Sequence, residues 1–240
     1  MVFAARLTQR GHHIASMADL ERLYERPYTD TALKTIAALP HPTVQKFAVI
    51  TVAIVGASRR FLAQITRHQN EVKFMSASLQ YSDYSGSAEF AMPYEIITAR
   101  EEIREKYRQA CCTVLSEYEQ LCKAGIGHDS AGYLTPQGLR NVLIISATPY
   151  QWKHMIGQRV CRRNTDETRL VMLMIWRELY KLSSVLFAPE LTGPFCQRGR
   201  CAEGKMSCGR PIPKEMLPAD ILLTDYPMLR KEAAIEGQAD

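Results

Sequence analysis

Hydrophobic residues recur at helical spacing along several segments of the chain. In residues 99–124 the apolar side chains follow one stripe and the charged ones lie opposite, which predicts a long amphipathic helix. Residues 169–187 are apolar on more than one side, so a second long helix is predicted to be buried on several faces. The stretch 164–167, Asn-Thr-Asp-Glu, supplies cap-like residues and first-turn acids that favour a helix start there.

Shorter helices are predicted elsewhere. Residues 14–38 contain two helical stretches, which are separated near Pro27 and end before Pro40. Residues 149–162 begin with a proline at a favoured first helical position, although Gly157 weakens the middle of this helix.

Two segments have the composition of buried strands. Residues 46–57 form a β-branched apolar run of strand length, and the helical spacing of residues 58–68 follows directly. Residues 140–148 are the second strand candidate, preceded by the turn-rich connector 132–138. Long helices around a few apolar strands predict a single α+β domain, in which helices pack a small antiparallel or mixed sheet.

The C-terminal part of the chain differs in composition from the rest. Beyond Pro189 it becomes rich in glycine and proline, which indicates loops and turns. We therefore expect one domain over residues 1–210 and a peripheral tail over residues 211–240.

Composition and charge narrow the function classes. With 240 residues, 46% hydrophobic and 23% charged, the chain has the balance of a globular protein and not of a disordered or fibrous one. The net charge is +5, and basic residues gather in two clusters that suit either an anionic partner or a mildly basic solvated surface. The clusters are Arg59, Arg60, Arg67 and His68, and Arg159, Arg162, Arg163 and Arg169.

Several partners are not expected. The chain has no lysine and arginine tract, zinc finger or aromatic RNA-binding motif, so we expect a small phosphorylated ligand and no nucleic acid. It has neither a leader-type apolar region near its start nor a run of about 18 apolar residues, which predicts a cytoplasmic protein without a membrane partner.

The cysteine pattern argues against disulfides and against a metal. Seven cysteines, an odd number in a chain without a secretion signal, are expected to be reduced thiols. The cluster of Cys196, Cys201 and Cys208 suggests zinc or an iron–sulphur cluster, but a closed zinc site uses four ligands and their spacing is not the usual close Cys pair. We therefore expect no metal site.

Common dinucleotide, nucleotide triphosphatase, zinc protease and hydrolase motifs are absent, but an ordered series of shorter motifs is present. The series resembles the flavin-dependent thymidylate synthases, which carry a histidine-led segment, a strand ending in G-x-SR, a helix ending in Q-x-x-RHR, a loop closing in S-x-RYS, and later N-AR, LR and AQWEIR motifs. The corresponding residues here are 41–43, 49–59, 64–69, 78–82, 148–150, 158–159 and 164–169. The resemblance covers about residues 41–210.

The resemblance implies a function. Family members have a thymidylate synthase complementing protein-like fold and methylate dUMP reductively to dTMP. Methylenetetrahydrofolate gives the one-carbon unit, and FAD, reduced by NADPH, gives the hydride. They are homotetramers whose nucleotide and flavin sites are built between subunits, so the same cofactors, co-substrates and assembly are expected here.

The resemblance also assigns site residues. Arg67, His68 and Gln69 match the flavin motif, with Gln69 replacing its second arginine, and His154 falls near the flavin. The nucleotide-binding set is Gln64, Ser78, Gln80, Tyr81 and Arg159. Arg159 is the predicted catalytic residue, because a fixed cation stabilises negative charge that develops on the pyrimidine oxygen.

Each of these assignments has a structural alternative. Arg67 and His68 suit a helix C-terminus in any protein. Arg159 could be a surface arginine paired with Asp166 or Glu167. His154, among apolar neighbours, could be packed and hydrogen-bonded without binding any ligand.

Departures from the family motifs keep other functions open. Gln80, Gly132 and Tyr150 stand where the family carries arginines, and Arg162, Arg163, Arg140 or Lys73 are candidates to replace the lost charges. A charge-assisted hydrogen bond contributes about 1.5–3 kcal/mol, so these losses matter for a phosphate. The alternatives are a diverged enzyme acting on another nucleotide or small substrate, and a nucleotide-binding homologue without catalysis.

Overall fold

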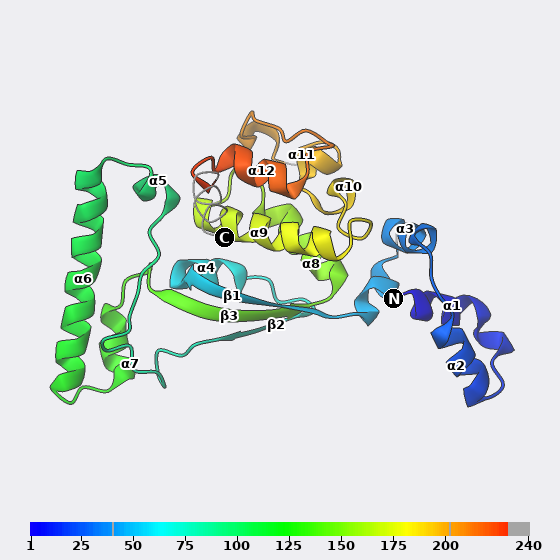
Figure 1. The fold of residues 1–240 in the computed structure, drawn as a ribbon, viewed down its shortest axis with the longest axis horizontal. Coiled ribbons are helices and arrows are strands. Elements are labelled where there is room, and N and C mark those ends of the chain that lie inside the picture. The colour runs from blue at the N-terminus through cyan, green and yellow to red at the C-terminus, as the bar shows by residue number, and fades with distance from the viewer. Residues whose placement is uncertain (40, 202, 230–240) are drawn as a thin grey trace, which may run out of the picture.

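The computed structural model describes residues 1–39, 41–201 and 203–229. A three-stranded antiparallel sheet in the order β1-β3-β2 forms its centre, from β1 (Ile50–Ser58), β2 (Val72–Ser76) and β3 (Arg140–Ala147). Helices cover one face of this sheet (Figure 1). The predicted α+β fold with a small antiparallel sheet is confirmed.

The core lies between the sheet and the helices α4 (Arg59–Ile65), α8 (Pro149–Arg159) and α9 (Asp166–Leu182). Alternate residues of β3 are buried, because successive side chains of a strand point to opposite faces. Trp152 of α8 and Trp176 of α9 are completely buried in this layer. Helix α9 is therefore buried on several faces, as the apolar density of residues 169–187 predicted.

Two arms extend from this core and give the molecule an elongated shape (Figure 1). One arm carries the amphipathic helix α6 (Glu101–Lys123), and the other consists of α1 (Val2–Arg10), α2 (Met17–Glu25) and α3 (Asp30–Ala38). Short helices complete the described elements: α5 (Tyr94–Ile97), α7 (His128–Ala131), α10 (Pro189–Thr192), α11 (Phe195–Arg198) and α12 (Pro218–Asp225).

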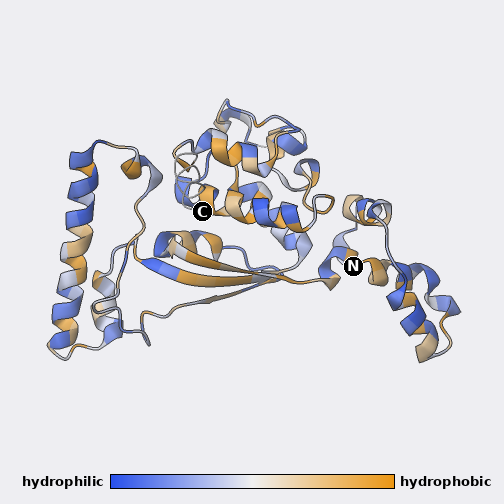
Figure 2. Cartoon of the chain, in the orientation of Figure 1, coloured by the Kyte–Doolittle hydropathy of each residue, from blue (hydrophilic) through white to orange (hydrophobic). Residues whose placement is uncertain are grey.

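The face of the sheet opposite the helices stays open. Figure 2 shows that the strands are largely hydrophobic, and part of this apolar surface is exposed to solvent. Val55 is 81% exposed, Met75 72%, Val142 47% and Ile144 41%. Val55 pairs with Val142 and Met75 with Ile144 across the strands, so these side chains form one apolar strip.

A bulge connects β1 to α4. The register of β1 against β3 shifts at Gly56, whose φ of 86° lies in the left-handed region that glycine favours. Ser58 then caps α4 by accepting a hydrogen bond from the Phe61 N–H at 3.1 Å. The carboxylate of Glu167 accepts the Ser58 backbone N–H at 2.7 Å and its hydroxyl, which fixes this turn to α9.

Three parts of the fold differ from the sequence predictions. Residues 72–76 form strand β2 where we expected a loop, and residues 2–10 form a helix that was not predicted. Within the predicted peripheral tail, α12 packs on α9 and buries Ile221, Leu222 and the following Tyr226. This part of the tail belongs to the core because its apolar positions cover α9, whereas residues 230–240 lie outside the described residues.

In the described ranges, no helix combines the length and the apolar character that crossing a bilayer requires.

Candidate functional site

The end of α8 meets the end of α4 through Arg159. Its Nε donates a hydrogen bond to His68 Nε2 at 2.9 Å, and its Nη2 donates to the carbonyl oxygen of Gln64 at 2.8 Å. Its Nη1 lies 3.5 Å from Asn164 Oδ1. Three of the predicted site residues are thus in direct contact, although Arg159 and His68 are far apart in the sequence.

The alternative partners of Arg159 are engaged differently. The Glu167 carboxylate binds Ser58, and the backbone carbonyl of Asp166 accepts the Tyr226 hydroxyl at 3.0 Å. In the described part of the chain, Arg159 therefore donates its hydrogen bonds to neutral acceptors. Because no carboxylate neutralises it there, its charge stays available for an anionic group.

His68 is a neutral hydrogen-bond acceptor at this site. It is only 7% exposed. Burial, followed by the charges of Arg159 and His154, lowers the pKa of His68 from 6.5 to about 4. Since Nε2 accepts the Arg159 hydrogen bond, the proton of the neutral ring lies on Nδ1.

A pH dependence of stability follows from His68. Its folded pKa is depressed, so the unfolded chain binds more protons between about pH 6.5 and 4. As the pH is lowered from about 6.5 to 4, we expect this group to lower the free energy of unfolding by up to about 3 kcal/mol. Urea unfolding at several pH values tests this. A His68→Asn variant should show a shallower pH slope than a variant at the exposed His13, and equal slopes would contradict the assignment.

His154 connects this contact to a cationic cavity. Its ring meets the His68 ring edge-on, with centroids 5.8 Å apart and planes at 87°. The cavity has a volume of about 220 Å³. Three of its lining residues, Lys153, His154 and Arg198, are basic, and the described residues that line it include no carboxylate. This composition suits an anionic ligand.

Lys153 is the unusual member of this cavity. Its side chain is 7% exposed, and its Nζ donates to Gln45 Oε1 at 2.9 Å, a neutral partner. Burial lowers the pKa of Lys153 from 10.5 to about 8. Lys153, Gln45 and Arg198 were not predicted from the sequence. The one available signal was a lysine among the apolar positions of α8.

Removing the buried lysine charge should stabilise the ligand-free protein. The pKa of Lys153 is depressed in the folded protein. The cost of burying its ammonium is therefore fully present below about pH 8, and it disappears as the pH rises above the pKa of the lysine in the unfolded chain. We expect Lys153→Met to raise the free energy of unfolding at pH 7 by about 1–3 kcal/mol and to weaken binding of an anionic ligand. Lys181→Met, at an exposed position, is the control. A destabilised Lys153→Met protein with unchanged ligand binding would contradict this role.

The other predicted residues lie elsewhere in the same chain. Ser78 Oγ accepts the backbone N–H groups of Gln80 at 3.1 Å and Tyr81 at 3.3 Å, and Tyr81 is 83% exposed. These residues follow the end of β2, whereas Arg67, His68 and the exposed Gln69 precede its start. Since a five-residue strand spans roughly 13 Å between its end residues, the two groups lie at opposite ends of it.

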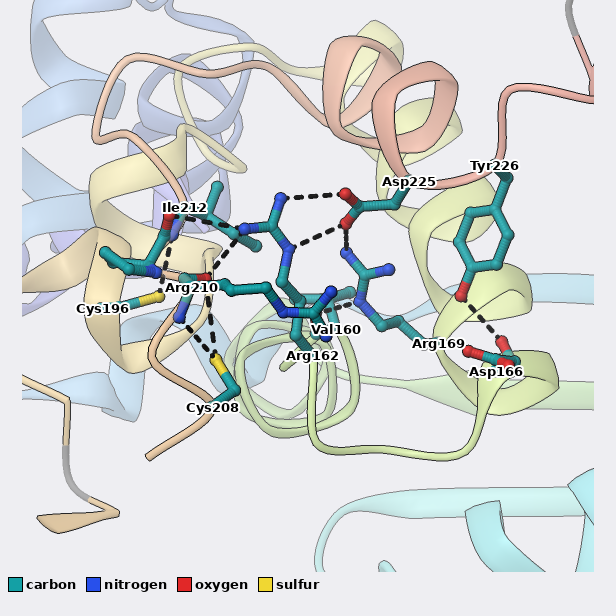
Figure 3. Close-up of polar contacts among 11 residues, drawn as sticks. Val160, Arg162, Asp166, Arg169, Cys196, Cys208, Arg210, Ile212, Asp225 and Tyr226 are labelled. Carbon is teal, nitrogen blue, oxygen red and sulfur yellow. Dashed lines mark hydrogen bonds and ion pairs between the residues drawn. The ribbon is translucent and has the colours of Figure 1, made fainter. Parts of the chain in front are cut away.

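The second basic cluster is mostly engaged in ion pairs. Figure 3 shows Arg162 and Arg169 converging on Asp225 of α12. Burial acts to raise the pKa of Asp225, but the two arginines hold it below its ordinary value. Among the candidates to replace the lost family arginines, Arg163 pairs with Glu203 at 3.3 Å and Arg140 pairs with Glu89. These arginines therefore support the structure, while Lys73 is exposed on β2.

A comparison with protein families decides the relationship. The model of the thymidylate synthase complementing protein family matches residues 1–183. The chain belongs to this family. The matched part of this family member contains Arg159, His68, Gln64 and the basic residues 153 and 154, whereas Arg198 and the clustered cysteines lie beyond it.

Curated relatives agree with the family assignment. A flavin-dependent thymidylate synthase from Thermococcus onnurineus (strain NA1) is 29% identical over 193 residues, which cover 78% of this chain and 77% of that protein. One from Geobacter sulfurreducens (strain ATCC 51573 / DSM 12127 / PCA) is 26% identical over 178 residues, covering 74% and 75%.

A solved structure supports the fold of this family member. The UMP/dUMP methylase PolB from Streptomyces cacaoi, crystallised with 5-Br dUMP, has a TM-score of 0.56 at 16% sequence identity. The match covers 78% of this chain and 86% of that chain.

Proposed function

We propose that this protein is a flavin-dependent thymidylate synthase that methylates dUMP reductively to dTMP. Methylenetetrahydrofolate is the one-carbon donor, NADPH the reductant and FAD the cofactor. The observation that carries the proposal is the contact of Arg159 with His68 and Gln64, because it joins the predicted flavin and nucleotide residues in one site. The names of the curated relatives support the same activity.

The residues present fit a flavin dinucleotide. Its diphosphate is anionic, and the cavity beside His154 offers Lys153 and Arg198 without a described carboxylate. The buried ammonium of Lys153, which has only an amide oxygen as partner, would gain an anionic partner there. When bound, the flavin supplies the hydride that completes the methyl group.

The side chains of this protein then bind and polarise the pyrimidine. Arg159 is held in place by His68 and the Gln64 carbonyl, so its guanidinium is preorganised to stabilise charge on a ring oxygen during attack. The Nδ1–H of neutral His68 is a donor toward the flavin side. The Gln64 side-chain amide carries both a donor and an acceptor, the combination that a uracil edge requires.

The proposed assembly is a homotetramer, with Ser78, Gln80 and Tyr81 completing the site of another copy. In one chain these residues lie beyond the far end of β2 from Arg67 and His68. The open apolar strip of Val55, Met75, Val142 and Ile144 supports self-association, since contiguous exposed apolar surface marks contact sites.

Breaking this strip should dissociate the assembly. Val142→Asp places a charge in the middle of the strip, and we expect a smaller oligomer with at least tenfold lower activity, because burying an unpaired carboxylate costs several kcal/mol. Size-exclusion chromatography with light scattering measures the mass. Glu215→Arg, an exposed change before α12, should leave the mass unaltered. A Val142→Asp protein of unchanged mass and activity would contradict the interface.

The reaction itself is tested by tritium release. Protein incubated with FAD, methylenetetrahydrofolate, NADPH and 5-tritiated dUMP should release tritium to water and form dTMP. Flavin binding without release would overturn the proposal in favour of a diverged enzyme with another substrate. Failure to take up flavin would instead favour a homologue without catalysis.

The diverged enzyme has one specific observation in its favour. Gly132, where the family carries an arginine, is buried, and a Cβ there would lie 3.5 Å from the Leu79 side chain. The loop that carries Ser78 and Gln80 therefore packs against Gly132, the position where family members carry an arginine. Parallel tritium assays with UMP and dUMP distinguish a changed sugar preference from the proposed reaction.

A further inference from the structure

Four cysteines from separate segments line one small cavity. Cys161 follows the end of α8, Cys196 lies in α11, and Cys201 and Cys208 lie in the loop after it. The cavity has a volume of about 40 Å³, far below the roughly 300–1,000 Å³ of sites for organic ligands. Three of these cysteines are clustered in the sequence, where no metal site was expected, and the fold supplies Cys161 as a fourth.

The sulphur atoms receive backbone hydrogen bonds. The Arg210 N–H donates to Cys208 Sγ at 3.4 Å, and the Ile212 N–H donates to Cys196 Sγ at 3.5 Å (Figure 3). The Arg163 N–H donates in the same way to Cys161. Gly209, with a φ of 67°, allows the tight turn that brings the Arg210 N–H back to Cys208. Such donors stabilise thiolates and are the outer partners that metal–thiolate sites use.

The crowding of the four thiols favours a bound cation. All four line one small cavity, so their charges would lie close together if they ionised. Thiolates gathered in this way repel one another unless a positive centre lies between them. A coordinating metal reverses this effect, because it deprotonates the thiols that bind it.

The spacing of the sulphurs indicates which centre fits. A tetrahedral zinc with Zn–S bonds of about 2.3 Å brings its sulphurs within about 3.8 Å of one another. Among the residues that the structure describes, no three of these thiols have their sulphurs mutually within 4.8 Å. An iron–sulphur cluster distributes its cysteine ligands over more than one iron atom, so no three of them need to lie close together.

We propose that Cys161, Cys196, Cys201 and Cys208 bind an iron–sulphur cluster. The surrounding charges suit it. A cluster with four thiolate ligands is anionic. Arg162 and Arg210 line the cavity, and the Glu203 carboxylate that also lines it is paired with Arg163 at 3.3 Å. The cluster would tie the segment after α8 to residues 196–212.

This cluster would also act on the catalytic residue through the chain. Cys161 is two positions beyond Arg159, so ligation fixes the end of α8 from which Arg159 projects. The cluster is a positioning element in this account and takes no part in hydride transfer. The proposal does not depend on the substrate of the enzyme.

The test is elemental analysis of the whole protein. Protein purified without oxygen, or reconstituted with iron and sulphide, should contain at least two irons per chain with about one acid-labile sulphide per iron, and give a cluster EPR signal after reduction. Iron and sulphide are measured because flavin absorbance overlaps the visible bands. Cys161→Ser and Cys208→Ser should each lose most of both, whereas Cys112→Ser, at an exposed position on α6, should keep them.

Each other outcome overturns the proposal. One zinc per chain without sulphide would replace the cluster with a zinc site, and a disulfide among these cysteines without metal would exclude both. Full iron in Cys161→Ser would remove Cys161 from the ligand set. Circular dichroism of each variant distinguishes loss of a ligand from loss of the fold, and wild-type iron content tests the proposal even where a variant fails to fold. Tritium release by metal-free wild-type protein would leave the proposed function standing while this proposal fails.

Discussion

Arg159→Ala is expected to lower turnover by about 10²–10³-fold while the protein still binds flavin, because a preorganised cation at a developing oxyanion contributes about 2.7–4 kcal/mol. The three contacts of Arg159 hold it in one orientation before substrate arrives. Its effect should therefore appear mainly in kcat and less in KM. Steady-state tritium release with saturating dUMP provides the measurement.

Two further variants make the Arg159 result specific. Arg159→Lys keeps a charge but loses the planar fork that binds His68 and the Gln64 carbonyl, so an intermediate rate is expected. Arg177→Ala, which removes an arginine paired with Glu178 on α9, should leave turnover unaltered. A normal rate in Arg159→Ala would show that another group polarises the pyrimidine.

Asp225→Asn is expected to lower the free energy of unfolding by about 3–5 kcal/mol, because it leaves two buried arginines without their counter-charge. Arg162 Nε and Nη2 bind the carboxylate at 3.1 and 2.9 Å, and the Arg169 side chain is 5% exposed beside it. Arg169 Nε also donates to the Val160 carbonyl at 3.0 Å, next to Arg159. Loss of Asp225 should therefore loosen the end of α8 as well as α12.

Urea unfolding with and without flavin measures this effect. Asp220→Asn removes an exposed carboxylate from the same helix and should change stability by less than about 0.5 kcal/mol. Equal stability of the two variants would mean that the ion pairs of Asp225 contribute little. Asp225 lies in the segment that the sequence assigned to a peripheral tail, so a large loss would also confirm that segment as part of the core.

Long periodic patterns predicted the fold well. The stripe of residues 99–124 and the apolar surface of 169–187 correspond to α6 and α9, and the β-branched run before Gly56 corresponds to β1. Strand β2 was missed because it has only five residues and none of them is fully buried. Helix α12 was missed because its eight residues are too few to show a helical period, and only contact with α9 gives its apolar positions a partner.

Local patterns indicated only part of the candidate site, for a physical reason. Gln64, His68 and Arg159 each lie at a helix end, whose position such patterns define, and the fold brings them into contact. Their roles stay predictions. Lys153 and Arg198 were missed because nothing in the sequence reports that α8 and α11 face each other across a cavity. Cys161 was missed for the same reason, since its three partner cysteines lie in another segment.

Basic groups from separate segments are proposed to surround one flavin and the pyrimidine that it reduces. A crystal structure of the assembled protein with FAD and dUMP would show whether they do. We expect the isoalloxazine beside His68, the flavin diphosphate near Lys153 and His154, and the pyrimidine oxygen bound by Arg159. Ligands bound away from Arg159, in one chain and between copies, would rule this site out.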